Sequence, residues 1–308
     1  MKSQNSGRVI FIVGPTAVGK SAVAAALAKR INAEIISCDS MQVYKGMRIL
    51  ASYPDRSLLK STYHHLIADI SPGVEYNASK YRSQALKRIK EIESKGKVPI
   101  LAGGTGLYMS VLVDGIFKVK AGDKLVRERL YRQRARKGSA YLHTRLKKVD
   151  PAAAKKIHPN DAKRIIRALE VFEITGKPIS VLQTQRNGLS ADHDVRIFCL
   201  NMDRDELYRR IDSRVDAMFK AGLVNEVKKL IKSGLSKTSR TALGIKEVKG
   251  YLEGLYNLEE AKRLLKLNTR HYAKRQLTWF RKDKRIRWLE IKPGEKPSLV
   301  ADKIMSEL

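Results

Sequence analysis

A short apolar run followed by a glycine-rich loop constrains the fold of this chain more than any other feature. The run is 9–13, and the loop that follows it, GPTAVGKS at 14–21, fits the pattern G-x-x-x-x-G-K-[ST]. The alanine-rich residues 20–31 predict a helix after the loop. A strand, such a loop and a helix together form a phosphate-binding P-loop, in which backbone N–H groups and the helix N-terminus hold phosphate oxygens. We expect phosphate binding by Gly14, Pro15, Thr16, Ala17, Val18, Gly19, Lys20 and Ser21, with the Ser21 hydroxyl suited to Mg²⁺.

Strands and helices alternate along most of the chain. Apolar runs at 33–37, 98–104, 195–202 and 286–291 predict further strands, and the helical period of 77–95 predicts a helix between two of them. This alternation is typical of parallel βαβ units. The sequence therefore predicts an α/β fold, with a P-loop NTPase-like doubly wound parallel sheet formed by 1–115 and 191–308.

Residues 116–190 interrupt this alternation, because they contain no run that predicts a buried strand. Helices are predicted over 125–136, 152–156 and 162–175, with breaks at Gly122, Gly138, Pro151, Pro159 and Gly176. The segment holds 19 Lys and Arg against 6 Asp and Glu, a net charge of +13. We expect an inserted, basic, all-helical domain.

The charge of the whole chain points to a polyanionic partner. It has 62 Lys and Arg against 31 Asp and Glu, a net charge of +31, which predicts attraction to nucleic acid. Its two cysteines, Cys38 and Cys199, are too few for a disulfide framework or a zinc cluster. The N-terminal residues lack the apolar core of a signal peptide, and no apolar run is long enough to span a bilayer. We expect a cytoplasmic protein without a membrane partner.

Two polar residues follow predicted strands at the edge where the P-loop lies. Asp39 comes after the strand 33–37, and Thr105 lies in GGTGLY, 103–108, after the strand 98–104. The carboxyl ends of parallel strands meet in one crevice, so both side chains should face the group bound beside the phosphates. There Asp39 could serve as a general base, although position alone also allows a solvated loop residue or a helix N-cap.

The order of several motifs resembles the bacterial tRNA dimethylallyltransferase family. The motifs are GPTAVGKS, ISCDSMQVY, HHLI, AGGTGLY, HPNDAKRIIRALE, SRTALGIKE and AKRQLTWFR, and they extend over nearly the whole chain. The resemblance implies transfer of a prenyl group from dimethylallyl diphosphate to the exocyclic amine of the adenine directly 3′ of the tRNA anticodon. Pyrophosphate would leave, and ATP would not be consumed. This sequence lacks the zinc-finger extension of eukaryotic relatives. It also lacks a lysine that the family commonly has near the position of Tyr53.

The resemblance also assigns roles to residues. Asp39 matches the family's base, while Lys20, Thr105 and Ser21 with Mg²⁺ would stabilise the departing pyrophosphate. Arg204 is similar to the family arginine that contacts the diphosphate; a surface ion pair with Asp203 or Glu206 is the alternative.

Further residues are expected to meet tRNA, with the chain acting as a monomer. Ser40, Met41 and Gln42 follow the base and could line a pocket for the extruded adenine. Contacts with the anticodon stem-loop are expected from Arg127, Lys163, Arg164, Ile165, Ile166 and Arg167. In 270–287, basic residues alternate with aromatic ones, which could either contact RNA or belong to the core.

Two other functions remain open from the residues alone. A P-loop kinase for a small metabolite could use Asp39 as the base for a hydroxyl group, and a non-enzymatic RNA-binding protein could also carry a P-loop. The net charge and the basic insertion disfavour a small acceptor. A non-enzymatic protein would not need Asp39 and Thr105 at these positions.

Overall fold

The computed structural model describes residues 7–117 and 123–308. The chain divides into two compact units, which we call the core unit (Met1–Val113 with Leu189–Leu308) and the helical unit (Asp114–Gly188). The predicted break at Gly122 and most of the N-terminal segment lie outside the described residues.

The core unit is built on a six-stranded sheet in which every neighbouring pair is parallel. The strand order is β3-β2-β4-β1-β5-β6. The strands are β1 (Arg8–Val13), β2 (Ala33–Ser37), β3 (His64–His65), β4 (Val98–Ala102), β5 (Asp194–Asn201) and β6 (Arg287–Glu290). The predicted α/β fold with a parallel sheet is confirmed. Since β1 lies between β4 and β5, its carboxyl end opens at the middle of the sheet edge, where ligands bind in such folds.

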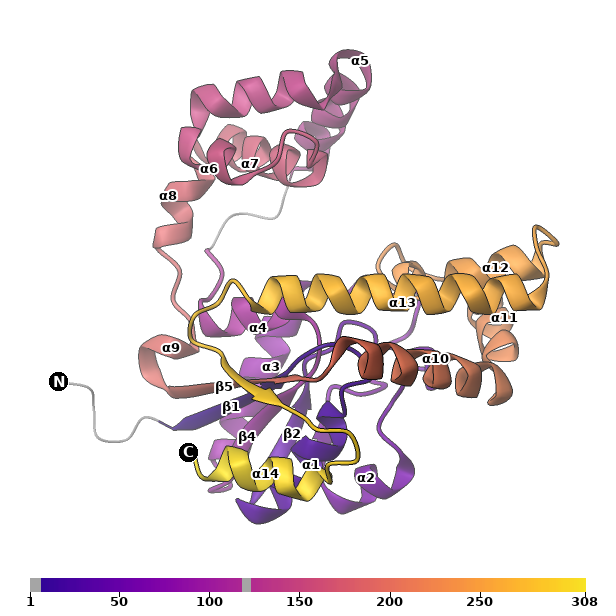
Figure 1. Cartoon of the computed structure of the whole chain (residues 1–308). Coiled ribbons are helices and arrows are strands. Elements are labelled where there is room, and N and C mark those ends of the chain that lie inside the picture. Colours follow the sequence, from indigo (N-terminus) through magenta and orange to yellow (C-terminus); the bar gives the residue numbers. More distant parts are fainter. Residues whose placement is uncertain (1–6, 118–122) are drawn as a thin grey trace. The chain divides into compact units, whose positions relative to one another are not determined.

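Helices cover both faces of this sheet (Figure 1). Helix α1 packs against α14 on one face, while α3, α4 and α13 lie toward the other (Figure 1). The helices of the core unit are α1 (Lys20–Arg30), α2 (Arg56–Ser61), α3 (Ala78–Glu93), α4 (Gly106–Val113), α9 (Leu189–Asp192), α10 (Arg204–Lys220), α11 (Leu223–Ser233), α12 (Ile245–Leu252), α13 (Leu258–Phe280) and α14 (Pro297–Met305), with a 3₁₀ turn at Ser239–Thr241.

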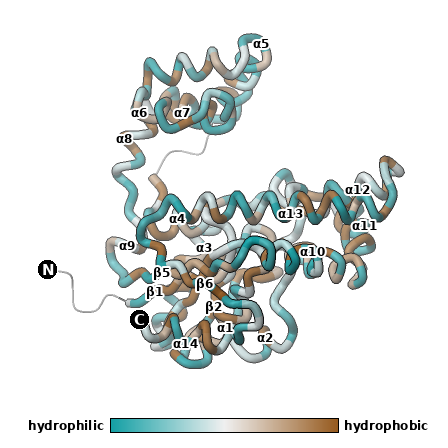
Figure 2. Tube along the Cα trace, viewed as in Figure 1, coloured by the Kyte–Doolittle hydropathy of each residue, from teal (hydrophilic) through white to brown (hydrophobic). Residues whose placement is uncertain are grey.

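The core explains why the apolar runs become strands. All five residues of β2 are buried, as are five of the six in β1, because both faces of the sheet are covered. Ile10 and Ile12 of β1 pack in one cluster with Leu27 of α1 and Val300 of α14. Figure 2 shows the same pattern as hydrophobic residues gathered in the strands and the inner sides of the helices.

The helical unit contains α5 (Lys124–Val149), α6 (Pro151–Lys156), α7 (Ala162–Thr175) and α8 (Ile179–Thr184). The predicted helix 125–136 and the predicted break at Gly138 are confirmed, but a second helical stretch that was not predicted follows the break and continues to Val149. Gly138 adopts a positive φ of 78°, which glycine tolerates without steric cost. Leu142 and Leu146 lie four residues apart and join Leu130 in a buried cluster, which is why the second half of α5 is helical.

Candidate active site

The P-loop joins β1 to α1 and relies on glycine at two positions. Gly14 and Gly19 have φ values of 140° and 100°, and a Cβ on Gly14 would lie 2.5 Å from the carbonyl oxygen of Leu200 in β5. A larger residue would therefore clash with the neighbouring strand. No side chain caps the N-terminus of α1, so its first N–H groups are available to an anion.

Lys20 is the first residue of α1 and points into the loop. Its Nζ donates a hydrogen bond of 2.7 Å to the carbonyl oxygen of Pro15. Burial lowers the pKa of Lys20 to about 8, an effect that the nearby carboxylate of Asp39 opposes and the cation of Arg214 reinforces. An anion bound at the loop would favour the charged form of this lysine.

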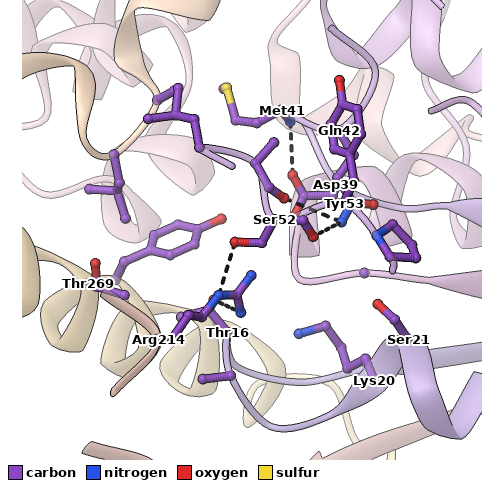
Figure 3. A pocket seen from close by; sticks show the side chains of 18 of the residues that line it. Thr16, Lys20, Ser21, Asp39, Met41, Gln42, Ser52, Tyr53, Arg214 and Thr269 are labelled. Carbon is purple, nitrogen blue, oxygen red and sulfur yellow. Dashed lines mark hydrogen bonds between the residues drawn. The ribbon is translucent and has the colours of Figure 1, made fainter. Parts of the chain in front are cut away.

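Asp39 lies on the opposite side of the same crevice from the P-loop (Figure 3). One carboxylate oxygen, Oδ1, accepts a hydrogen bond of 2.9 Å from the backbone N–H of Met41. The carboxylate makes no other hydrogen bond within the described residues. A carboxylate oriented by one bond and otherwise open to the crevice is suited to accept a proton from a bound group.

Thr105, in the loop after β4, supports Asp39 without lining the crevice itself. The backbone N–H of Thr105 donates to the carbonyl oxygen of Cys38 at 3.1 Å. The Thr105 hydroxyl accepts a hydrogen bond of 3.1 Å from the backbone N–H of Ser40. Both bonds flank Asp39, so Thr105 holds the peptide that carries this carboxylate.

The crevice has a volume of about 660 Å³ and belongs entirely to the core unit. Of the residues predicted to bind phosphate or tRNA, those that line it are Thr16, Ala17, Gly19, Lys20, Ser21, Asp39, Ser40, Met41 and Gln42. Gly14, Pro15, Val18 and Thr105 are not among its lining residues, and Val18 is buried in the core. The Gln42 amide bonds to Ser37, Ala51 and Ser52, so it shapes the wall with its hydrogen bonds already used.

Arg214 of α10 lines the crevice, although the sequence reasoning did not select it. Its Nε donates to the Ser52 hydroxyl at 3.0 Å and its Nη1 to the Thr16 hydroxyl at 3.2 Å. Burial lowers the pKa of this guanidinium, and Asp39 acts in the opposite direction. No carboxylate pairs with Arg214 among the described residues. A partly buried cation without a carboxylate in an ion pair is suited to bind an anionic ligand.

Arg204, the arginine selected from the sequence, does not line the crevice. Its side chain is 78% exposed and pairs with Asp205 at 3.3 Å. The preceding residue, Asp203, caps the N-terminus of α10 by accepting bonds from the N–H groups of Asp205 and Glu206. The start of α10 therefore faces solvent, and Arg214, further along the same helix, faces the P-loop.

The donor set of the crevice fits Mg²⁺ when phosphates are also bound. The Ser21 hydroxyl lines the crevice and makes no hydrogen bond within the described residues. In residues 7–117 and 123–308 no cluster of three or more His, Cys, Asp or Glu side chains could hold a metal ion. Mg²⁺ commonly takes one or two protein oxygens and obtains its other ligands from phosphates and water, so Ser21 is a suitable ligand.

The residues of the helical unit that are predicted to contact tRNA differ in their exposure to solvent. Ile165 and Ile166 are buried in the hydrophobic cluster of the unit. Arg127 and Arg167 both pair with the buried carboxylate of Glu170, at 2.9 Å each. Lys163 and Arg164 are exposed, and Arg164 also pairs with Asp161 at 2.7 Å. The isoleucines therefore support α7, while its basic residues remain accessible.

No helix within the described ranges is long and apolar enough to cross a membrane.

Comparison with known proteins places the chain among enzymes of one kind. A family model described as IPP transferase matches residues 42–283. The chain is 46% identical over 285 residues to a tRNA dimethylallyltransferase of Geobacter sulfurreducens, covering 92% of each protein. It is 47% identical over 306 residues to a tRNA dimethylallyltransferase of Carboxydothermus hydrogenoformans, covering 98% of this chain and 97% of the relative.

Solved structures agree with these relatives. The tRNA isopentenylpyrophosphate transferase of Bacillus halodurans is similar with a TM-score of 0.71 and 38% identity, covering 98% of this chain and 97% of that protein. A eukaryotic dimethylallyltransferase acting on tRNA is similar with a TM-score of 0.83 and 28% identity, covering 98% of this chain and 80% of that protein.

Proposed function

The chain belongs to the IPP transferase family and is a prenyltransferase that acts on tRNA, and we propose that its crevice carries out the transfer. The donor is dimethylallyl diphosphate, and the acceptor is the exocyclic amine of the adenine directly 3′ of the anticodon. The bond between the amine nitrogen and the allylic carbon forms, the bond between that carbon and the diphosphate oxygen breaks, and pyrophosphate leaves.

The diphosphate binds at the P-loop. The charged side chains of Lys20 and Arg214 and the N-terminus of α1 meet there, and together they stabilise the negative charge that grows on the leaving group. Mg²⁺, held by Ser21, supplies further neutralisation of that charge when bound. Since Arg214 and Lys20 have no carboxylate partner in an ion pair, the donor supplies the missing counter-charge.

Asp39 is the general base. The lone pair of an adenine amine is delocalised into the ring, so the amine is a weak nucleophile until its proton is removed. Asp39 accepts that proton as the new bond forms, while the N–H of Met41 and the supports at Cys38 and Ser40 keep the carboxylate in place. The acceptor adenine can enter the crevice only when it is flipped out of the anticodon loop, which costs a few kcal/mol.

The helical unit contributes basic side chains that bind tRNA phosphates. Lys163 and Arg164 are exposed on α7, and Arg127 and Arg167 present guanidinium groups anchored by Glu170. Such contacts fix the register of an RNA helix without reading its sequence. We propose the anticodon stem as the segment bound.

The observation that carries this proposal is that a carboxylate, Asp39, lines the same crevice as the P-loop lysine and an unpaired arginine. The test is to incubate the protein with unmodified tRNA, Mg²⁺ and dimethylallyl diphosphate, and to determine the masses of the released nucleosides. A gain of one five-carbon prenyl unit on adenosine is expected. Phosphorylation of a small metabolite by ATP, without any prenyl gain on tRNA, would contradict the proposal.

A further inference from the structure

A single side-chain amide connects the two glycine-rich loops of the core unit. Gln276 lies on α13 and is only 6% exposed. Its Oε1 accepts a hydrogen bond of 2.9 Å from the backbone N–H of Thr16 in the P-loop. Its Nε2 donates a hydrogen bond of 2.9 Å to the carbonyl oxygen of Gly104 in the loop after β4.

The polarity of the two partners defines what this position requires. One partner is an N–H donor and the other a carbonyl acceptor, so the side chain must accept at one atom and donate at the other. The loops also come close around the amide, because a Cβ on Gly104 would lie 2.1 Å from Nε2 and 3.4 Å from the carbonyl oxygen of Gly14. An ionised carboxylate or an aliphatic side chain cannot satisfy both loops.

The Gln276 amide also connects the phosphate-binding loop to the loop that carries Asp39, the general base. From Gly104 the chain continues to Thr105, whose two hydrogen bonds to Cys38 and Ser40 flank Asp39. Within the described residues, no hydrogen bond joins the loop 14–21 directly to 103–106 or to 38–42. Gln276 therefore bridges the loop that holds the diphosphate donor and the loops that hold Asp39, the general base.

We propose that Gln276 is a positioning residue that sets the spacing between the diphosphate site and Asp39; this inference rests on the prenyl transfer proposed above. The reacting atoms must approach within a narrow range, and a displacement of about 1 Å can cost on the order of 100-fold in rate. Loss of the bridge lets the two loops move apart, so the transfer step slows while each substrate still binds.

The test measures kcat and KM for tRNA in the full chain with dimethylallyl diphosphate and Mg²⁺. Gln276→Met keeps the length of the side chain but removes both hydrogen bonds. We expect kcat to fall by about tenfold to 100-fold with KM for tRNA changed by less than about twofold. A kcat within about twofold of the wild type in this variant would overturn the proposal.

Gln276→Glu provides a second readout, the pH dependence of kcat, which would stay the same if Gln276 only stabilised the fold. The ionised carboxylate still accepts from Thr16 but repels the carbonyl oxygen of Gly104, whereas the protonated acid can donate to it. Burial raises the pKa of such a carboxyl, so the ratio of variant to wild-type kcat should rise as the pH falls from about 8.5 to about 6. The charged and titratable side chains that line the crevice beside position 276 are the same in both enzymes, among them Lys20, Asp39, Arg214 and Tyr272. A ratio that does not change with pH would count against the proposal.

Two further variants keep the test decisive. Asn225→Asp makes the same amide-to-carboxylate change at an exposed position of α11, and its kcat ratio should stay near one at every pH. Gly104→Ala disturbs the bridge at its Gly104 end, because the new Cβ would displace Nε2 of Gln276. If both changes act through one bond, the double variant Gly104→Ala, Gln276→Met should be about as slow as the slower single variant. Fully multiplied losses would contradict the bridge even if Gln276→Glu fails to fold.

Discussion

The Thr105 hydroxyl accepts a hydrogen bond of 3.1 Å from the backbone N–H of Ser40, the residue after Asp39. This bond joins two loops that follow different strands. Thr105 does not line the crevice, so we propose that it affects the reaction by holding the peptide of Asp39.

Substitution of Thr105 should separate its hydroxyl from its shape. Thr105→Val keeps the branched shape but removes the acceptor, and we expect kcat to fall by about tenfold because Asp39 is less well oriented. Thr105→Ser keeps the acceptor and should retain most of the activity. Single-turnover rates with saturating tRNA and donor measure this step. Equal rates for the serine and valine variants would show that the hydroxyl has no such role.

Asp39→Asn removes the base but preserves the local structure. The amide oxygen of asparagine can still accept the hydrogen bond from Met41, so the loop should keep its shape. Removal of a general base commonly costs on the order of 10² to 10⁴ in rate. We expect a loss of that size in the transfer rate, with the Kd for tRNA unchanged in a filter-binding assay. Near-normal turnover would exclude Asp39 as the base.

Arg214 and Arg204 offer a matched pair on one helix. Arg214→Met should raise the Kd for dimethylallyl diphosphate by about tenfold or more, because a charge-assisted hydrogen bond contributes about 1.5–3 kcal/mol. Arg204→Met removes the same charge from an exposed side chain and should change that Kd by less than about twofold. Isothermal titration with the diphosphate measures both. The reverse ranking would restore Arg204 as the diphosphate contact.

The difference between these arginines shows what local sequence can and cannot predict. The P-loop was predictable because its motif, strand and helix are contiguous, and the sheet followed from the alternation of apolar runs and helical periods. The approach of Arg214 to Thr16 joins residues 198 positions apart, and it depends on how α10 packs. No local pattern favours Arg214 over Arg204, which is the nearer of the two along the sequence to the end of β5.

Short or highly charged elements were missed for other reasons. Strand β3 has two residues, His64 and His65, too few for a period of two to be recognised. The second half of α5 is rich in basic residues, and Leu142 and Leu146 are the apolar residues that mark its buried side, beside His143. Gln276 lies among basic and aromatic residues, and its contacts depend on the approach of α13 to both loops, which no local pattern predicts.

Charge reversal on α7 tests the role of the helical unit. Lys163→Glu and Arg164→Glu change exposed residues and should leave the unit folded. We expect the Kd for tRNA to increase and the slope of log Kd against log salt concentration to decrease by about one for each lost phosphate contact. The Kd for dimethylallyl diphosphate should not change. An unaltered salt slope would mean that neither side chain contacts a phosphate.

Lys20→Met should stabilise the ligand-free protein while it weakens donor binding. The pKa of Lys20 is about 8 in the folded protein and 10.5 is its ordinary value. Between these values the unfolded chain binds more protons, so the cost of burying the charge is complete below pH 8 and fades as the pH rises toward 10.5. At pH 7 we expect the variant to melt about 3 °C higher, since the lost bond to Pro15 offsets part of the gain.

This stability difference should shrink at higher pH and reverse with ligand. Near pH 9.5 the wild-type lysine is largely neutral in the fold, so the melting temperatures of the two proteins should approach each other. Addition of the diphosphate donor should raise the melting temperature of the wild type more, because only that protein provides the lysine cation. Lys29→Met, at an exposed position of the same helix, serves as the control. A lower melting temperature for Lys20→Met at pH 7 would show that the Lys20 side chain contributes more to packing than its buried charge costs.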